Sequence, residues 1–325
     1  MKGFLTFWII VLFCNFCTIS VFADTLSTNS SEKSGFVQVP GGKIWYKIFG
    51  VEKKGIPLLC LHGGPGATHD YLLPLAEIAD ERPVIFYDQL GSGNSDKPTD
   101  QSLWTISRFV EELEIVRKEL GLKKVHILGQ SWGSMLATDY ILTKNPTGIM
   151  SLIFSGPCLS VKKWVSDQRA YLNELPENIK KVIFEKEAAK DFSSTGYQNA
   201  MNEYYKLHIC RMAKWPECVN NTFAKMGHQV YEYMCGPSEF DCSGTLKDYE
   251  RVESLKKLKL PVFYTCGEFD EATPKTVAFY QENTPGSEFK VYKAASHMHH
   301  IEQEKEYLSD LRNFLRKIEN QQNIR

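Results

Sequence analysis

The sequence has no excess of charge of either sign and carries few signs of a bound nucleotide, metal or nucleic acid. Its 325 residues include 38 Lys and Arg against 39 Asp and Glu, which gives a net charge of −1. This balance, without a basic block or an acidic tail, argues against nucleic acid as the main partner. No G-x-x-x-x-G-K-[ST] or G-x-G-x-x-G motif indicates a phosphate-binding loop. After residue 23 no C-x-x-C pair indicates zinc, so we expect neither a metal nor an organic cofactor.

Long apolar runs are also scarce, and the only one that approaches the length of a membrane span lies at the N-terminus. After Lys2 no charged residue occurs until Asp24, and Val21-Phe22-Ala23 precedes a polar stretch. This pattern predicts a signal peptide at residues 1–23 and a secreted or lumenal protein. The alternative is an uncleaved anchor, since about 20 apolar residues can span a bilayer. The small residues at the expected cleavage site favour the signal peptide, after which we expect no stable membrane insertion.

The cysteines that follow the signal peptide number seven. Cys60 and Cys266 lie in apolar, strand-like runs and are predicted to be buried thiols. The other five lie between residues 156 and 248, and some of them would pair in an oxidising compartment. The sequence does not decide the connectivity. Our hypothesis is two local pairs, Cys210–Cys218 and Cys235–Cys242. The N-x-[ST] sequons at Asn29 and Asn220 predict a glycoprotein.

Strand and helix patterns alternate along most of the chain. Short, continuously apolar runs that end in glycine or polar residues predict buried strands, and apolar residues at helical spacing predict helices between them. This order predicts an α/β fold with a mostly parallel central sheet. A hairpin is predicted at 36–50, strands at 56–63, 83–91, 123–129, 149–157, 260–270 and 287–297, and helices at 69–80, 105–120, 133–144 and 303–319.

The alternation is interrupted once, in the middle of the chain. After Pro157 the sequence becomes rich in Lys, Glu, Tyr and Asn with helical periodicity, and the strand signal returns only near residue 260. One α/β domain with a helical insertion explains this better than two tandem domains. The predicted boundaries are a first core part at 24–157, a helical cap at 158–255 and a second core part at 256–325.

The segment KVHILGQSWGS, residues 124–134, contains the strongest functional signal. Gly129-Gln130-Ser131-Trp132-Gly133 matches G-x-S-x-G between a predicted strand and a predicted helix, which is the context of a nucleophile elbow. Side chains at the two glycines would collide with neighbouring elements in so tight a turn. The alternative is an ordinary turn in which Ser131 caps the helix. The context favours Ser131 as a nucleophile.

A nucleophilic serine needs a base and an acid that orients the base. In α/β-hydrolases they follow in the order Ser, Asp, His. Asp270 comes just after one predicted strand and His297 just after the next, where the active sites of such sheets collect. We therefore predict Asp270 and His297 as the partners of Ser131. The competing neighbours are Glu268 and Glu271 for the acid, and His299 and His300 for the base; the last two would otherwise lie at a solvated helix start.

Acyl transfer also requires donors for the developing oxyanion. The Trp132 N–H directly follows the nucleophile, and the loop His62-Gly63-Gly64-Pro65-Gly66 follows an early strand. We predict the N–H groups of Gly64 and Trp132 as the oxyanion hole.

These motifs together resemble a known family. HGGPG at 62–66, DQLGSGNS at 88–95, GQSWGS at 129–134 and GEFDEATP at 267–274 resemble the proline iminopeptidases of the α/β-hydrolase fold. GPSEF at 236–240 with GTLKDY most resembles the branch of the tricorn-interacting aminopeptidases. The resemblance covers about residues 36–318.

The resemblance implies a serine exopeptidase that releases an N-terminal residue, often proline, from short peptides with a free N-terminus. In that branch two glutamates bind the substrate's amino group, and the matching positions here are Glu239 and Glu271. Without the resemblance, Glu239 would be interpreted as a solvated loop residue. Because Cys235 and Cys242 flank Glu239, a disulfide between them would hold its loop rigid. The relatives are commonly cytosolic, so the N-terminal segment and the extra cysteines of this chain put strict proline specificity in doubt.

Two other functions remain open at this point. An amino-acid amidase or esterase would use the same three residues on small amides or esters. A catalytically inactive α/β-hydrolase would act as a binding protein, although such proteins typically lose the nucleophile or the histidine. Dehalogenase and epoxide hydrolase chemistry is disfavoured, because those enzymes have an aspartate in place of Ser131. The sequence does not indicate the oligomeric state.

Overall fold

The computed structural model describes residues 31–323 and contains one eight-stranded sheet. The predicted signal peptide and the Asn29 sequon lie outside this range. Within residues 31–323 no helix has both the length and the apolar character that crossing a membrane requires.

The sheet has the order β1-β2-β4-β3-β5-β6-β7-β8. The predicted hairpin is confirmed as an antiparallel pair, β1 and β2, and β2 joins β4 in antiparallel register. All other neighbours are parallel, so the predicted α/β-hydrolase architecture is confirmed. The strands are β1 (Glu32–Val39), β2 (Gly42–Phe49), β3 (Leu58–Leu61), β4 (Val84–Tyr87), β5 (Val125–Gln130), β6 (Ile149–Ser155), β7 (Val262–Gly267) and β8 (Glu288–Tyr292).

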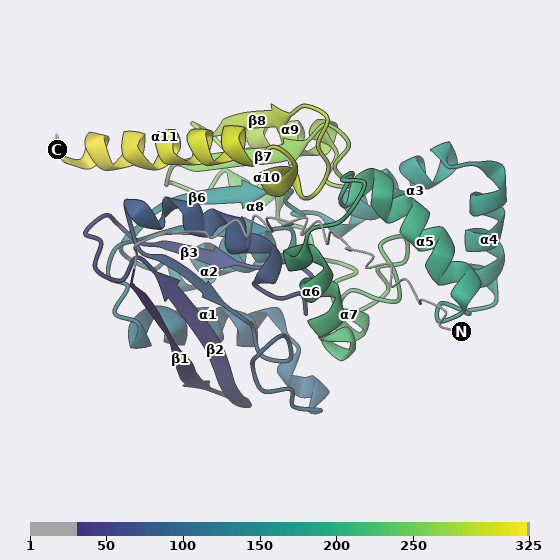
Figure 1. The fold of residues 1–325 in the computed structure, drawn as a ribbon, viewed down its shortest axis with the longest axis horizontal. Coiled ribbons are helices and arrows are strands. Elements are labelled where there is room, and N and C mark those ends of the chain that lie inside the picture. The colour runs from purple at the N-terminus through teal and green to yellow at the C-terminus, as the bar shows by residue number, and fades with distance from the viewer. Residues whose placement is uncertain (1–30, 324–325) are drawn as a thin grey trace, which may run out of the picture.

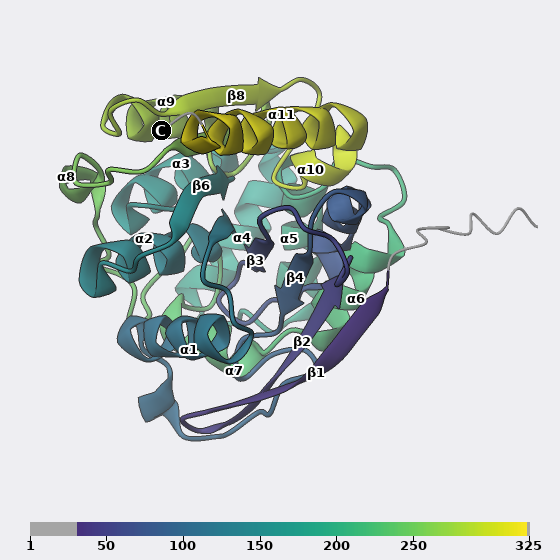
Figure 2. The ribbon, with the colours of Figure 1, turned by 90° about the vertical axis from the view of Figure 1, so that its left-hand side faces the viewer.

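Helices cover both faces of the sheet, because successive side chains of each strand point to opposite faces. In β3, Leu59 and Leu61 join the core under α1, α2 and α9, whereas Leu58 and Cys60 join the core under η1 and α11. Figures 1 and 2 show α1 and α2 on one side of the sheet and α11 on the other. The helices are η1 (Asp70–Asp80), α1 (Ile106–Glu119), α2 (Trp132–Lys144), α9 (Pro274–Glu282) and α11 (Glu304–Asn323), with the shorter η2 (Gln101–Leu103), α8 (Val252–Leu255) and α10 (His299–Glu302).

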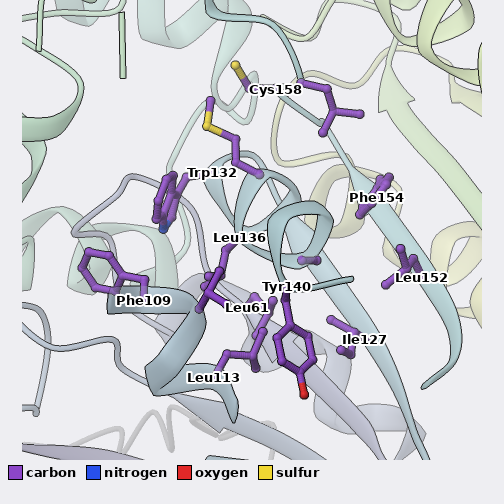
Figure 3. Packing of buried hydrophobic residues seen from close by; sticks show 14 of the residues in the cluster. Leu61, Phe109, Leu113, Ile127, Trp132, Leu136, Tyr140, Leu152, Phe154 and Cys158 are labelled. Atoms are coloured by element: carbon purple, nitrogen blue, oxygen red, sulfur yellow. The ribbon is translucent and has the colours of Figure 1, made fainter. Parts of the chain in front are cut away.

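The helix predicted at 69–80 is present as a 3-10 helix, η1. Pro74 lies inside it and has no N–H to donate to a carbonyl one α-helical turn back, which disfavours a regular α-helix. Helix α2 is buried on all sides through its first nine residues. Figure 3 shows Trp132, Leu136 and Tyr140 packed between α1 and side chains of the sheet. This packing holds the start of α2, and with it Ser131, in a fixed place.

Five helices, followed by the short α8, lie between β6 and β7 where the helical insertion was predicted. Figure 1 shows α3, α4 and α5 beyond the carboxyl ends of the parallel strands. They have a separate apolar core that includes Leu172, Ile183, Tyr204 and Phe240. The five helices are α3 (Val161–Glu174), α4 (Glu177–Ala188), α5 (Thr195–His208), α6 (Glu217–Lys225) and α7 (His228–Met234).

The seven cysteines in residues 31–323 are all free thiols in this structure. Cys60 in β3 and Cys266 in β7 are buried, as predicted. Neither hypothesised disulfide is formed. The Sγ atoms of Cys235 and Cys242 lie 3.5 Å apart, beyond the bonded distance of about 2 Å.

Candidate active site

Ser131 lies in the turn between β5 and α2, with φ 52° and ψ −120°. A non-glycine residue in this region of backbone space is strained and persists only where its surroundings enforce it. A Cβ at Gly129 would collide with the Gly133 carbonyl, and a Cβ at Gly133 with the Leu61 carbonyl. The Ser131 side chain makes no capping hydrogen bond to α2, which removes the main argument for a helix-cap role. Its hydroxyl is therefore available for other contacts.

Asp270 and His297 meet at the carboxyl ends of β7 and β8. His297 Nδ1 lies 2.7 Å from Asp270 Oδ1, and both side chains are buried. The N–H groups of Gly267 and Ala272 also donate to Asp270, at 3.1 and 2.8 Å. Burial alone would raise the pKa of Asp270, but the charge and hydrogen bond of His297 outweigh it, with help from His299, and the pKa is lowered. The carboxylate therefore stays ionised and holds the imidazole with Nδ1 protonated.

His299 and His300 do not lie at a solvated helix start, and this expectation was wrong. Both are buried, because α10 packs against α11 and η1 rather than facing solvent. His299 Nδ1 lies 3.4 Å from Asp270 Oδ2, and its Nε2 lies 3.0 Å from the hydroxyls of Ser155 and Thr265. His299 thus supports the oxygen of Asp270 that His297 leaves free. From the sequence, His299 was considered only as an alternative to His297 for the base.

Ser131 and His297 line one cavity of about 330 Å³. The hydrogen bonds among residues 31–323 include none between Ser131 Oγ and His297. Instead, His297 Nε2 lies 3.4 Å from Glu271 Oε1. Catalytic hydrogen bonds are often long or misaligned in unliganded enzymes and tighten when substrate binds. The free Nε2 in the same cavity as Ser131 is the arrangement that a general base requires.

Glu239 and Glu271 both line this cavity, Glu239 from the loop after α7 in the inserted segment and Glu271 from the loop after β7 in the core. Glu239 accepts hydrogen bonds from the Tyr231 hydroxyl and from Trp164 Nε1, the latter at 3.1 Å. The Trp164 ring also packs edge-on against His297. The sequence did not indicate Tyr231 or Trp164, since both lie in helices of the inserted segment whose packing it does not specify.

The two glutamates have raised pKa values. Burial raises the pKa of Glu239, although the hydrogen bonds from Tyr231 and Trp164 act against it. Burial also raises the pKa of Glu271, and the nearby charges of Glu239 and Asp270 raise it further. A cavity that concentrates carboxyl groups in this way would be stabilised by a cationic ligand, which pairs with both. Asp270, whose pKa is lowered, already has a partner in Nδ1 of His297.

The two predicted oxyanion donors come from the turn after β3 and from the start of α2. Gly64 lines the cavity at the turn after β3 and has φ 106°, a conformation that favours glycine. Trp132 begins α2, and its side chain points away from the cavity, with Nε1 donating to Gln89 Oε1 at 2.8 Å. Its backbone N–H belongs to the first turn of α2, where N–H groups have no acceptor within the helix.

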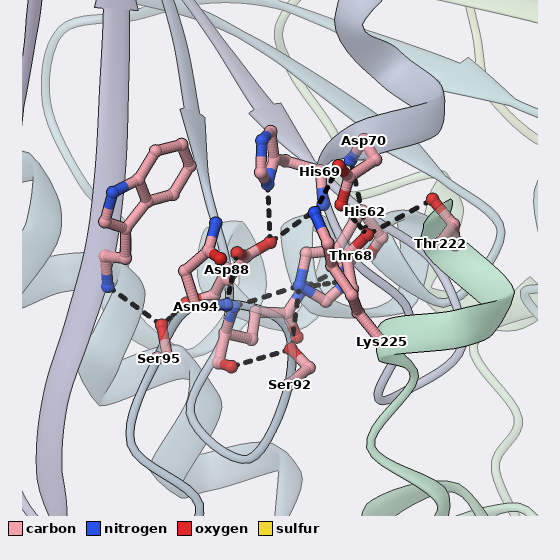
Figure 4. Close-up of polar contacts among 12 residues, drawn as sticks. His62, Thr68, His69, Asp70, Asp88, Ser92, Asn94, Ser95, Thr222 and Lys225 are labelled. Atoms are coloured by element: carbon pink, nitrogen blue, oxygen red, sulfur yellow. Dashed lines mark hydrogen bonds and ion pairs between the residues drawn. The ribbon is translucent and has the colours of Figure 1, made fainter. Parts of the chain in front are cut away.

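A buried polar network holds the glycine-rich loop in place (Figure 4). Asp88, at the end of β4, accepts hydrogen bonds from His69 N and Asn94 N, both at 2.8 Å, and contacts His69 Nδ1 at 2.8 Å. The inserted segment also contacts this region. Lys225, the last residue of α6, forms an ion pair with Asp70, the neighbour of His69, at 2.8 Å. The loop that carries Gly64 is thus fixed from the sheet and from α6.

We expect Asp88→Asn to lower the free energy of unfolding by about 3 kcal/mol at neutral pH. The amide nitrogen cannot accept a hydrogen bond, so the N–H of His69 or of Asn94 would lose its partner. Urea denaturation checks this, with Asp96→Asn as the control. Asp96 is exposed and accepts from Lys43 N, so its change should cost less than about 1 kcal/mol.

The pH dependence of this effect follows from the pKa of Asp88. Burial would raise that pKa, but the hydrogen bond and charge of His69, the charge of His62 and the Asn94 N–H lower it overall. A lowered folded-state pKa stabilises the fold above the unfolded value of about 3.9, and this stabilisation is lost as the pH falls below it. The difference between wild type and Asp88→Asn should therefore shrink below pH 4. A difference that is constant with pH would contradict this account.

No group of three or more His, Cys, Asp or Glu side chains within the described range is arranged to hold a metal ion. The Asn220 side chain of the second sequon is exposed on α6 and donates to the Trp215 carbonyl at 3.0 Å.

Comparison with known proteins agrees with this geometry. Residues 56–304 match the family model described as the alpha/beta hydrolase fold. The chain is 43% identical over 285 residues to a proline iminopeptidase of Heyndrickxia coagulans, covering 87% of this chain and 99% of the relative. It is 37% identical over 289 residues to a proline iminopeptidase of Saccharolobus solfataricus, covering 88% and 93%. The chain belongs to the proline iminopeptidase family of α/β-hydrolases.

Solved structures extend this result. The crystal structure of the Mycobacterium smegmatis proline iminopeptidase matches with a TM-score of 0.81 and 33% identity, covering 88% of this chain and 98% of that one. The crystal structure of VinJ matches with a TM-score of 0.85 and 31% identity, covering 88% and 99%. The resemblance to the proline iminopeptidase family inferred from the motifs is therefore confirmed. Esterases at 18–19% identity share only the fold.

Proposed function

We propose that this protein is a serine exopeptidase that releases an N-terminal residue, proline foremost, from short peptides. The observation that carries the proposal is a single cavity with three features. It contains Ser131 on a strained turn, His297 bound to an ionised Asp270, and the carboxyl groups of Glu271, which is buried, and Glu239, which is half-buried. Membership in the proline iminopeptidase family supports the same activity.

In the proposed reaction His297 Nε2 accepts the proton of Ser131 as its Oγ attacks the carbonyl carbon of the first residue. Asp270 keeps His297 in the correct tautomer and stabilises its charged form. The Gly64 and Trp132 N–H groups bind the oxyanion. The C–N bond then breaks, and His297 returns the proton to the leaving amine. Water, deprotonated by the same imidazole, hydrolyses the acyl-enzyme and restores Ser131.

Glu239 and Glu271 would bind the substrate's charged amino group. Charge-assisted hydrogen bonds in a buried site are strong, and the bound ammonium would neutralise the pair of carboxylates. This contact places the N-terminus at a fixed distance from Ser131, so only the first peptide bond reaches the nucleophile. The cavity would therefore select exopeptidase over endopeptidase cleavage.

A panel of aminoacyl-naphthylamides on the purified mature chain tests the proposal. We expect proline-naphthylamide to be cleaved, and N-acetyl-proline-naphthylamide to react at least about 100-fold more slowly, because it lacks the cation that the glutamates bind. Equal rates for the free and blocked substrates would refute the exopeptidase assignment. Faster cleavage of another free aminoacyl group would leave the mechanism intact and change the specificity.

We also propose that residues 24–157 and 256–325 form the hydrolase core and residues 158–255 its cap, since three of the inserted helices, α3, α4 and α5, share an apolar core of their own. Secretion, with cleavage after Ala23 and glycosylation at Asn29 and Asn220, remains our proposal on the sequence alone. N-terminal sequencing of the chain purified from the medium should give Asp24 as the first residue.

A further inference from the structure

Helix α3 contacts both of the glutamates that line the cavity. Trp164 and Gln168 lie one turn apart on this helix. Trp164 Nε1 donates to the carboxyl group of Glu239 at 3.1 Å, and Gln168 Nε2 donates to the backbone carbonyl of Glu271 at 2.7 Å. Gln168 is fully buried and does not line the cavity. The two contacts differ in kind, because the first holds a carboxyl group and the second holds the main chain.

The orientation of the Gln168 amide follows from its two partners. A backbone carbonyl accepts and does not donate, so the atom of Gln168 that faces the Glu271 carbonyl is the nitrogen. The oxygen then faces the hydroxyl of Tyr204 on α5, which donates to it. Burial raises the pKa of Tyr204, so this hydroxyl keeps its proton. The Gln168 side chain is therefore held by α5 and in turn holds the main chain of Glu271.

The peptide group that Gln168 contacts is held at both ends. The carbonyl of Glu271 and the N–H of Ala272 belong to the same planar unit. Gln168 donates to the carbonyl, and Asp270 Oδ1 accepts from the N–H at 2.8 Å. The Cα atom of Glu271 lies in this plane, so the Glu271 side chain starts from a fixed point.

The carboxyl group of Glu271 has little else to keep it in place. Its Oε2 has no hydrogen-bond partner among the described residues, and its Oε1 lies 3.4 Å from His297 Nε2. Asp270, by contrast, also contacts the Gly267 N–H and His297 Nδ1, at 3.1 and 2.7 Å. Loss of the Gln168 contact should therefore displace Glu271 more than Asp270.

We propose that Gln168 is a positioning residue for amine recognition, which holds the Glu271 main chain so that the carboxyl group meets the substrate's ammonium. This inference rests on the proposed exopeptidase function. A binding group has to be held within about 0.5 Å of its productive position by the contacts that support it. Because Trp164 holds Glu239 from the same helix, α3 would fix the positions of the two glutamates relative to each other.

Gln168→Met tests the proposal, because methionine is also long and unbranched but has no N–H to donate. We expect kcat/KM for proline-naphthylamide to fall about 10-fold or more, while the rate on p-nitrophenyl acetate stays within about 2-fold. The ester has no amino group, so its rate reports on Ser131, His297 and Asp270. Equal losses on the two substrates would overturn the proposal and leave Gln168 with a purely structural role.

Tyr204→Phe is the matched control. It removes the hydrogen bond at the other end of the same buried amide but keeps the contact between Gln168 Nε2 and the Glu271 carbonyl. Its ratio of the two rates should change less than about 2-fold, although it also loses a buried hydrogen bond. If Tyr204→Phe lowers the ratio as much as Gln168→Met does, the effect comes from the packing of the inserted helices and the proposal fails.

A double-mutant cycle gives a readout that a structural role would not produce. In Glu271→Gln the charge that Gln168 positions is already absent, so the addition of Gln168→Met should change the ratio less than about 2-fold further. A further loss of about 10-fold in the double variant would overturn the proposal. A wild type that hydrolyses p-nitrophenyl acetate but not proline-naphthylamide would refute the exopeptidase function itself, and this inference with it.

A measurement that keeps Gln168 covers the case in which its variants do not fold. In a crystal structure of Ser131→Ala with prolyl-glycinamide, a Glu271 carboxyl oxygen should lie within about 3.2 Å of the substrate's amino nitrogen. Gln168 Nε2 should stay within the same distance of the Glu271 carbonyl oxygen. A Glu271 side chain that binds the amine while its carbonyl is turned away from Gln168 would overturn the proposal.

Discussion

Ser131→Ala should lower kcat by about 10⁴-fold or more while the fold and stability stay close to wild type. The reason is that the proposed reaction uses the Ser131 hydroxyl as its nucleophile, at the start of α2 and in the cavity that His297 also lines. The strained backbone at Ser131 is imposed by Gly129 and Gly133, so alanine inherits it and the elbow stays intact. Initial rates on proline-naphthylamide measure the effect.

Covalent labelling with a fluorophosphonate gives a second readout. Wild type should be labelled at one site, and Ser131→Ala should not be labelled. Ser193→Ala is the control, since Ser193 also lines the cavity but is exposed and lies in the inserted segment. It should retain both activity and labelling. Labelling that survives in Ser131→Ala would mean that another nucleophile does the chemistry.

The triad candidates could be predicted because parallel strands impose a simple geometry. Each strand that ends at the same edge delivers its next few residues to one place, so Asp270 after β7 and His297 after β8 had to lie near Ser131 after β5. The spacing of Gly129 and Gly133 around Ser131 also predicted the tight turn at the nucleophile. The buried strands could also be predicted from the sequence, since a short, continuous apolar run is typical of a parallel strand that is covered on both faces.

What the sequence could not supply was the packing that comes from distant segments. His299 is buried against Asp270 only because α10 packs between distant segments, α11 and η1. Trp164 and Tyr231 hold Glu239 only because α3 and α7 pack over the same cavity. Helical periodicity places a residue on a face but does not say which element that face meets.

Glu271→Gln should lower kcat/KM for proline-naphthylamide by about 10² to 10³-fold. The amide keeps the shape of the carboxyl but carries no charge, and its nitrogen would face the substrate's ammonium. For p-nitrophenyl acetate, which has no amino group, the same variant should keep its rate within a few-fold, because Ser131 and the Asp270–His297 pair are unchanged. The ratio of the two substrates therefore isolates amine recognition.

The pH dependence of that ratio tests the same carboxyl group. Burial and the charges of Glu239 and Asp270 raise the pKa of Glu271, so the carboxylate is lost at a higher pH than in an ordinary glutamate. In wild type the preference for the proline substrate should be complete above this raised pKa and decline as the pH falls through it. In Glu271→Gln the ratio should lose this dependence.

Glu232→Gln is the control for the substitution, since Glu232 lines the same cavity but is exposed to solvent. An exposed carboxylate gains little from an ion pair, so this variant should change the ratio less than about 2-fold. Equal losses on the proline substrate and on p-nitrophenyl acetate in Glu271→Gln would show that the residue acts through His297, which lies 3.4 Å away, and not through the amine. Only a loss confined to the charged substrate makes Glu271 the group that turns a general serine hydrolase into an exopeptidase.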